Sequence, residues 1–153
     1  MSFEIGKTFL KTAVVLVFLS TLGWASDRHH ELNGTWKLVP TRSEFGGEPA
    51  LQTGTVTIND REGHITVSRN FTYDGANQTV SYSSSIDGKL NSAIHDGPAF
   101  TSRAKWEGDV LRVTSTQDAI TTVERFRLTS DGSLLLTVDR PGHRIETLSF
   151  ERQ

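Results

Sequence analysis

Residues 64–86 read HITVSRNFTYDGANQTVSYSSSI, and they contain the pattern that determines the predicted fold class. Bulky apolar side chains alternate with Thr, Ser and Asn on both sides of the turn signal at residues 74–77. Alternation with a period of two residues is typical of a β-strand with one buried face and one wet face. Two such runs around an Asp-Gly turn predict a β-hairpin.

The same pattern continues from about residue 32 to the C-terminus, and no segment in this region has the pattern of an amphipathic helix. Turn signals rich in Gly, Asp, Asn and Pro interrupt it roughly every eight to twelve residues. They lie at residues 46–49, 62–63, 74–77, 87–88, 96–98, 107–109, 131–132 and 141–142. The strands between them are predicted at 34–39, 54–59, 64–73, 78–86, 99–106, 110–117, 120–128, 133–139 and 144–151, with a possible short strand around 92–95.

This series of short strands must hide its apolar face, either by closing into a barrel or by folding into a two-sheet sandwich. The short connections favour the barrel, because a Greek-key sandwich needs at least one long crossing link. The predicted fold class is therefore all-β: a single antiparallel up-and-down β-barrel of about 8–10 strands. A sandwich is the alternative.

The N-terminal segment differs from the rest of the chain. Lys7 and Lys11 precede the apolar run at residues 13–19, and Gly23 and Ala25 suit a signal-peptidase site. We therefore expect a signal peptide at 1–25, a flexible segment at 26–31 and a barrel domain at 32–153. An uncleaved signal anchor is the alternative, and either version predicts a secreted or periplasmic protein that meets the membrane only through this segment.

Composition restricts the classes of partner. The chain has 153 residues, 22% of them charged and 35% hydrophobic, which suits one globular domain. It has no cysteine, so its stability must come from the core without disulfides. The formal charge is −2 and becomes −3 without residues 1–25, which carry a net charge of +1. With no basic block, nucleic acid is not an expected partner. We also expect the protein to be a monomer.

A short motif opens the first predicted strand. Residues 33–36 read NGTW, and this Gly-x-Trp resembles the first motif of the lipocalins. Ser43 and Phe45, followed by Asp-Gly hairpins, are similar to small exported bacterial lipocalin-like proteins of the calycin type. The resemblance covers most of residues 32–153 as a pattern. It implies a bacterial host and a small molecule bound inside the barrel.

The motif also predicts how one end of the barrel is built. Gly34 lets the chain enter the strand closely, and Trp36 supplies a large apolar plug, so both are expected to be structural. The resemblance implies a late arginine packed over Trp36, for which Arg152 is the candidate. The second lipocalin motif is absent. Residues 40–53 are too few for the helical pair of the related fatty-acid-binding proteins, and residues 148–150 lack their Arg-x-Tyr.

Charged residues on the apolar face are the most informative positions. Arg69 is in phase with Ile65, Val67 and Phe71, so strict alternation directs its guanidinium into the barrel. Burial of an unpaired charge there costs on the order of several kcal/mol or more. Arg69 therefore needs an anion. Glu124, in phase with the apolar positions of its own strand, is one candidate. A ligand carboxylate is another, and a bulge that turns Arg69 outward is the third possibility.

Other interior positions complete the predicted ligand-binding set. Tyrosine combines an apolar ring with a hydroxyl that needs a partner when buried. The candidates are Arg69, Tyr73, Tyr82, Ser84, Ser102, Glu124 and Phe126, with core filling as the alternative role. Trp106 precedes a turn and is expected to close a barrel end. The alternate positions Arg103, Lys105, Arg112, Arg125 and Arg127 are expected to face water.

No catalytic or metal-binding pattern emerges from the sequence. The five histidines lack the spacing that brings two imidazoles onto one metal, and no nucleophile elbow or phosphate loop occurs. We therefore expect no metal, no cofactor and no enzymatic activity. The predicted function is binding of a small hydrophobic or amphipathic ligand in the barrel interior. The alternative is a periplasmic protein-interaction or inhibitor module built on a filled barrel.

Overall fold

The computed structural model describes residues 29–94 and 99–153. The predicted signal peptide at 1–25 lies outside the described residues, as do residues 26–28 of the predicted flexible segment and the turn at 96–98. In the part of the chain that is described, no helix has the length and apolar character needed to cross a membrane.

The described residues form ten β-strands and two short 3-10 helices. The helices are η1 (His30–Leu32) and η2 (Pro40–Arg42). The strands are β1 (Gly34–Leu38), β2 (Thr53–Arg61), β3 (His64–Tyr73), β4 (Ala76–Ser85), β5 (Asn91–Ile94), β6 (Ala99–Glu107), β7 (Val110–Gln117), β8 (Ile120–Leu128), β9 (Leu134–Asp139) and β10 (Glu146–Arg152). Every predicted strand is present with small differences at its ends, and the possible short strand is β5.

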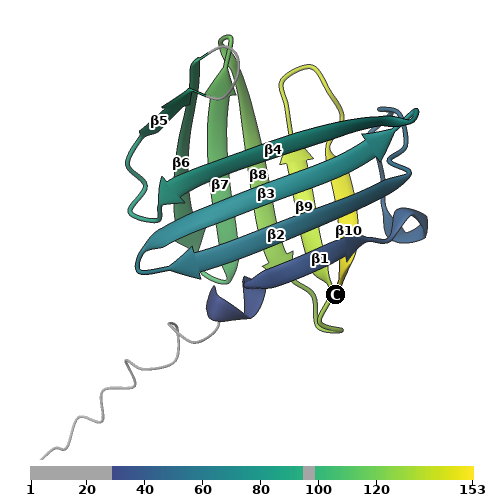
Figure 1. The fold of residues 1–153 in the computed structure, drawn as a ribbon, viewed down its shortest axis with the longest axis horizontal. Helices are drawn as coiled ribbons and strands as arrows, with labels where there is room; N and C mark the ends of the chain where they lie inside the picture. The colour runs from purple at the N-terminus through teal and green to yellow at the C-terminus, as the bar shows by residue number, and fades with distance from the viewer. Residues whose placement is uncertain (1–28, 95–98) are drawn as a thin grey trace, which may run out of the picture.

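All ten strands belong to one antiparallel sheet with the order β4-β3-β2-β1-β10-β9-β8-β7-β6-β5. Each strand pairs with its neighbour in sequence except at β4 and β5, and the pairing of β1 with β10 joins the two ends of the chain. The sheet curls round so that β1–β4 cross in front of β6–β10 (Figure 1). The predicted up-and-down barrel is confirmed, and the sandwich is excluded because the sheet is continuous.

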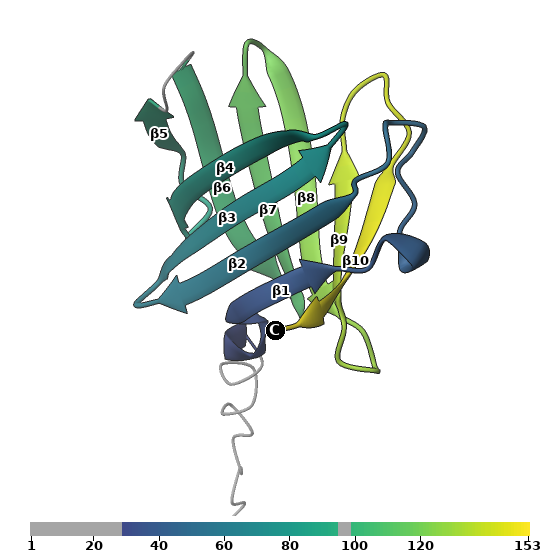
Figure 2. The same cartoon turned by 45° about the vertical axis from the view of Figure 1, so that its right-hand side comes forward.

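The barrel is nearly closed, and its seam lies between β4 and β6. Within the described residues, these two strands share no backbone ladder. The Ser84 and Ser102 hydroxyls are 2.6 Å apart across the seam, and the Gly88 amide donates to the Ala104 carbonyl at 3.0 Å. At the opposite side, β1 runs beside β10 and brings the C-terminus close to η1 (Figure 2). Closure protects the sheet edges from pairing with other chains.

One end of the barrel, which we call the closed end, is filled by apolar side chains. Strand pleating directs alternate residues inward, where they pack together at native density. The side chains with at most 1% exposure include Trp36, Val56, Ile58, Ile65, Val67, Leu111, Val113, Phe126, Leu134, Leu136, Leu148 and Phe150. This cluster is the hydrophobic core of the domain.

Trp36 closes this end as predicted. Its ring is fully buried, and its Nε1 donates to the Leu32 carbonyl at 2.9 Å. The Arg152 guanidinium lies over the ring at 4.3 Å and donates from Nη1 to the Asn33 carbonyl at 2.8 Å, so the predicted late arginine is confirmed. Gly34 has φ +136°, and a Cβ there would lie 2.8 Å from the Arg152 Nη1. Only glycine fits both the backbone angle and the arginine.

Trp106 also lies at a strand end, as predicted. Its indole is half-buried and stacks on the His29 imidazole, with ring centroids 3.9 Å apart and planes within 1° of parallel. The predicted flexible segment at 26–31 is described from His29 onward, where it already contacts the barrel.

Candidate functional site

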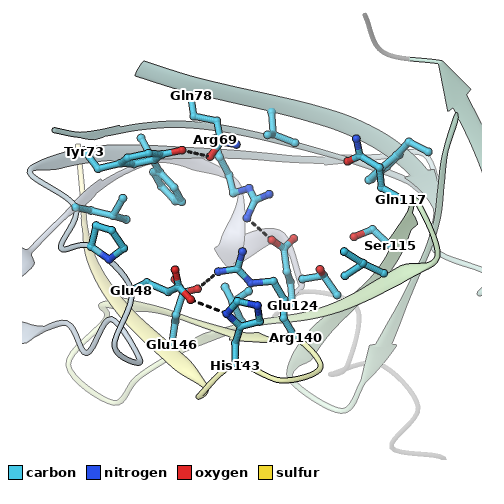
Figure 3. Close-up of a pocket in the computed structure, with 18 of the residues that line it drawn as sticks. Glu48, Arg69, Tyr73, Gln78, Ser115, Gln117, Glu124, Arg140, His143 and Glu146 are labelled. Atoms are coloured by element: carbon cyan, nitrogen blue, oxygen red, sulfur yellow. Dashed lines mark hydrogen bonds and ion pairs between the residues drawn. The ribbon is translucent and has the colours of Figure 1, made fainter. Parts of the chain in front are cut away.

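A cavity of about 570 Å³ occupies the other end of the barrel, which we call the open end (Figure 3). Its apolar lining is Pro49, Leu51, Phe71, Tyr73, Val80, Phe100, Ile120 and Val138. Its polar lining is Glu48, Arg69, Gln78, Ser115, Gln117, Asp118, Thr122, Glu124, Arg140, His143 and Glu146. Side chains from seven strands and from the segments before β2 and after β9 therefore converge on one space.

Arg69 points into this cavity from β3. Its strand pairs without interruption to Val56 of β2 and Val80 of β4, so the bulge that would turn Arg69 outward does not occur. The guanidinium Nη1 donates to Glu124 Oε1 on β8, across the barrel (Figure 3). The Tyr82 hydroxyl donates to the other carboxylate oxygen, Oε2, at 2.6 Å. The predicted ion pair is confirmed, with Tyr82 as a third member.

Burial and the neighbouring charges shift the pKa values of Arg69 and Tyr82. Glu124 is only 2% exposed, and these two side chains are its hydrogen-bond donors. Burial alone would lower the pKa of Arg69, but Glu124, Tyr82 and Glu146 together raise that pKa above its ordinary value. Burial, followed by the Glu124 charge, raises the pKa of Tyr82 well above its ordinary value. Arg69 is therefore a cation and Tyr82 a neutral donor at neutral pH.

The protein does not use all the donors of Arg69. Its side chain is 19% exposed, and the guanidinium also lies 5.8 Å from the Phe71 ring centroid. The Nε is buried and has no hydrogen-bond acceptor within the described protein. A guanidinium has five N–H groups, and a buried donor left unpaired costs about 1–3 kcal/mol. The Nη2 group makes no hydrogen bond with the described residues and is not buried, so it can donate to a polar group in the cavity.

A second ion pair lies on the wall beside the first. Arg140, just after β9, donates from Nη2 to Glu146 Oε1 on β10. Glu124 and Glu146 both pair in register with Val138 of the strand between them. Adjacent strands are about 4.8 Å apart, so the two carboxylates belong to the same level of the barrel. Each has its own arginine.

The mouth of the cavity is covered on one side by the segment between η2 and β2. Glu44 bridges Thr147 through backbone hydrogen bonds of 2.7 Å, which hold the segment against β10. The Glu48 carboxylate meets the His143 Nδ1 at 2.6 Å, and Leu51 is buried against the cavity. The segment is therefore attached both to β10 and to the turn that follows β9.

Three of the predicted ligand-binding residues line the cavity. Arg69 and Glu124 lie at its base, and Tyr73 lies on its wall, where the hydroxyl donates to Gln78 Oε1 at 3.0 Å (Figure 3).

The other four predicted residues face the interior but do not line the cavity. Tyr82 is 3% exposed and lies behind Glu124, whereas Phe126 is fully buried in the closed end. Ser84 and Ser102 bond to each other at the seam. Their predicted interior position is confirmed, and their role in ligand binding stays a prediction. Alternation specifies which face a side chain occupies but not its level along the barrel.

Sequence reasoning missed five ionisable residues of the cavity. Glu146 is in phase with the apolar positions of the last strand, so the rule that identified Glu124 also applies to it. The other four lie in connections, where periodicity has no meaning, and no sequence signal identifies them: Glu48, Asp118, Arg140 and His143. The described residues contain no group of three or more His, Cys, Asp or Glu side chains suited to hold a metal ion.

A second hollow, of about 530 Å³, lies on the outer face of β6–β8. Arg103, Lys105 and Arg112 line it together with several threonines. The five outer basic residues are exposed or half-exposed, as predicted, and Glu107 pairs with both Lys105 and Arg112. This face is solvated and separate from the cavity.

Comparisons with known proteins identify the fold. No family model matches the sequence, and no curated protein matches it. Fatty-acid-binding protein 1 of Echinococcus granulosus is 15% identical, with a TM-score of 0.61 over 80% of this chain and 98% of that one. A fatty acid binding protein of Schistosoma mansoni, in complex with arachidonic acid, is 18% identical, with a TM-score of 0.59 over 82% and 98%. Secretory abundant heat soluble protein 4 of Ramazzottius varieornatus is 15% identical, with a TM-score of 0.61 over 80% and 95%.

These similarities show the fold alone: a β-barrel of the kind found in fatty-acid-binding proteins. This chain differs in the connection between β1 and β2, whose helical content is the three-residue η2. The narrower resemblance to bacterial lipocalin-like proteins stays a prediction.

Proposed function

We propose that this protein binds a small apolar or amphipathic molecule in the cavity at the open end, with the polar end of that molecule directed toward Arg69. The observation that carries the proposal is the cavity itself. Its volume of about 570 Å³ lies within the range of roughly 300–1,000 Å³ that is typical of small-molecule sites. Apolar walls around a few convergent polar groups are the usual design of such a site.

Two further observations support binding over the alternatives. The open end is hollow, whereas an interaction or inhibitor module on a filled barrel needs no cavity. The structural neighbours include fatty-acid-binding proteins and one complex with arachidonic acid, so the same fold holds apolar ligands elsewhere. Both observations support ligand binding as the proposed function.

A fluorescence experiment tests the proposal. The neutral dye Nile red is added to the mature chain, and native mass spectrometry of protein purified from its host is used to detect a retained ligand. Ser115→Trp fills the cavity from β7 and is expected to abolish dye uptake. Thr114→Trp is the matched control, because the adjacent residue lines the hollow on the outer face. Equal dye uptake by wild type and Ser115→Trp would contradict the proposal.

The proposal includes export to the periplasm or the medium. It rests on the charged and apolar pattern of residues 1–25, which is typical of a signal peptide. Cleavage after Ala25 leaves a mature chain that begins at Ser26. Intact-mass measurement of the exported protein tests this: a mass that retains residues 1–25 contradicts cleavage, and recovery only from the cytoplasm contradicts export.

A further inference from the structure

The side chains that line the cavity carry more negative than positive charge. Four carboxylates and two guanidinium groups line it, a formal charge of −2 with His143 counted as neutral: Glu48, Asp118, Glu124, Glu146, Arg69 and Arg140. A site built to attract an anion has an excess of positive charge. This cavity has the opposite excess, although its two arginines alone suggest an anion site.

Both arginines already have a carboxylate partner. Arg69 pairs with Glu124 at the base of the cavity, and Arg140 pairs with Glu146 on the wall. A ligand carboxylate brought to Arg69 therefore meets Glu124 at nearly the same distance. The attraction of one charge and the repulsion of the other largely cancel, while the ligand still loses its hydration.

Glu124 is not free to give up this position. The Tyr82 hydroxyl donates to its second oxygen at 2.6 Å, and Tyr82 is 3% exposed. Displacement of the Glu124 carboxylate would leave a buried hydroxyl and a buried carboxylate without their partners, which is costly. An anionic ligand thus cannot replace Glu124 as the partner of Arg69 without disrupting the group.

An uncharged acceptor fits the same position. The Nη2 group of Arg69 makes no hydrogen bond with the described residues, and an alcohol, ester or amide oxygen can accept from it without bringing a second negative charge. Such a group also costs less to dehydrate than a carboxylate. A ligand ammonium is disfavoured at the same place because it faces Arg69 directly.

From this arrangement we infer that the cavity selects a neutral amphiphile with a hydrogen-bond acceptor at its polar end, and discriminates against the carboxylate of the same chain length. This inference rests on the proposed function, since it names the class of molecule that the same site takes. It assigns Glu124 the role of a specificity determinant: the residue stabilises the fold and excludes free acids.

Competition against Nile red tests the inference with three ligands of equal chain length. Dodecanol, dodecanoate and dodecylamine are titrated at pH 7, below their aggregation concentrations, into the dye-loaded mature chain. Dodecanol is expected to displace the dye at a concentration about tenfold or more below that of either charged ligand. Each charged ligand meets one like charge in the cavity, Glu124 for the carboxylate and Arg69 for the ammonium, and dodecanol meets none. Dodecanoate or dodecylamine displacing the dye as well as dodecanol does would overturn the inference.

Charge-neutralising variants assign the selectivity to named residues. Glu124→Gln keeps the side-chain shape and an acceptor for Tyr82 but leaves the charge of Arg69 uncompensated. The affinity for dodecanoate relative to that for dodecanol is therefore expected to rise about tenfold. Glu146→Gln frees Arg140 in the same way and serves if the first variant does not fold. Glu151→Gln is the matched control: it removes an outer partner of Arg42, 2.6 Å away, and leaves the ratio unchanged.

The experiment distinguishes failure of the proposed binding function from failure of the inferred selectivity. If the dye does not enter the wild-type barrel and none of the three ligands is retained in native mass spectrometry, the proposed function itself is wrong. If the dye enters and dodecanoate competes as well as dodecanol, binding stands and the selectivity is wrong. An unchanged ratio in folded Glu124→Gln and Glu146→Gln likewise contradicts the role given to the paired carboxylates.

Discussion

The two ends of the barrel are built from the same strands but hold different side chains. In the β7–β8 hairpin, Leu111 and Phe126 lie opposite each other at the closed end, both fully buried. Farther along the same ladder, Ser115 and Thr122 lie opposite each other and line the cavity. One hairpin thus provides packing at one end and space at the other, so stability and binding should respond to different substitutions.

The largest expected effect is a loss of stability at the closed end. Phe126→Ala removes a fully buried ring and is expected to lower the free energy of unfolding by about 3–5 kcal/mol. Urea denaturation followed by tryptophan fluorescence measures this change. The folded fraction of the variant should still take up Nile red, and a cost below about 1 kcal/mol would show that this end is not the core.

The ion pair at the boundary between the two ends should have the next largest effect. Glu124→Ala leaves Arg69 and the Tyr82 hydroxyl without an acceptor, and we expect a loss of about 2–4 kcal/mol. Because Arg69 is partly exposed to the cavity, we expect the loss of stability to lie near the lower end of this range. The triple variant Arg69→Met, Tyr82→Phe and Glu124→Leu removes all three polar partners, so it should return to within about 1 kcal/mol of wild type in the same denaturation experiment. A fully stable single variant would contradict the buried pair.

Alkaline pH tests the same boundary through Tyr82. Its pKa is raised in the folded protein, so the unfolded chain loses this proton first. The contribution of Tyr82 to the free energy of unfolding is fully present below its ordinary pKa of 10.0. As the pH rises from 10.0 toward the folded pKa, this contribution is lost by at most about 1.4 kcal/mol per pH unit. Denaturation between pH 9 and 11 should show a shallower decrease of stability with pH in Tyr82→Phe than in wild type, and an equal decrease in both would contradict the raised pKa of Tyr82.

The smallest effect on stability is expected within the cavity. Thr122 lines it and makes no side-chain hydrogen bond in the described structure. Thr122→Val keeps the β-branched shape, so the free energy of unfolding should change by no more than about 0.5 kcal/mol. Nile red binding should tighten by about two- to fivefold, because the wall becomes more apolar. A large loss of stability would mean that the open end is packed like the closed end.

The period-two pattern predicted much of this arrangement before any coordinates. Pleating requires neighbouring side chains to point to opposite faces, so the inward direction of Arg69 and Glu124 followed from position alone. The cost of an isolated buried charge predicted that Arg69 needs an anion, with Glu124 and a ligand carboxylate both open as that anion. The contact of Trp36 with Arg152 followed from the resemblance to the lipocalins and not from periodicity.

Other features did not follow from the pattern. Ser84, Ser102 and Phe126 share the inward face with Arg69, yet they lie at the seam or in the closed end. Strands in a barrel are tilted, so the level of a residue depends on the register of every ladder between it and its neighbours. Residues of the connections, such as His143, have no periodicity from which to place them.

The sequence alone determined the strands, their order as a meander, the face on which each side chain lies and the need of Arg69 for an anion. These properties depend on local geometry and on the cost of burying charge. Only the tertiary structure decided which interior residues meet, that the closed end is filled while the open end keeps a cavity, and that both arginines of the cavity are already compensated. Those properties depend on register, tilt and the path of the connections, which many distant residues set together.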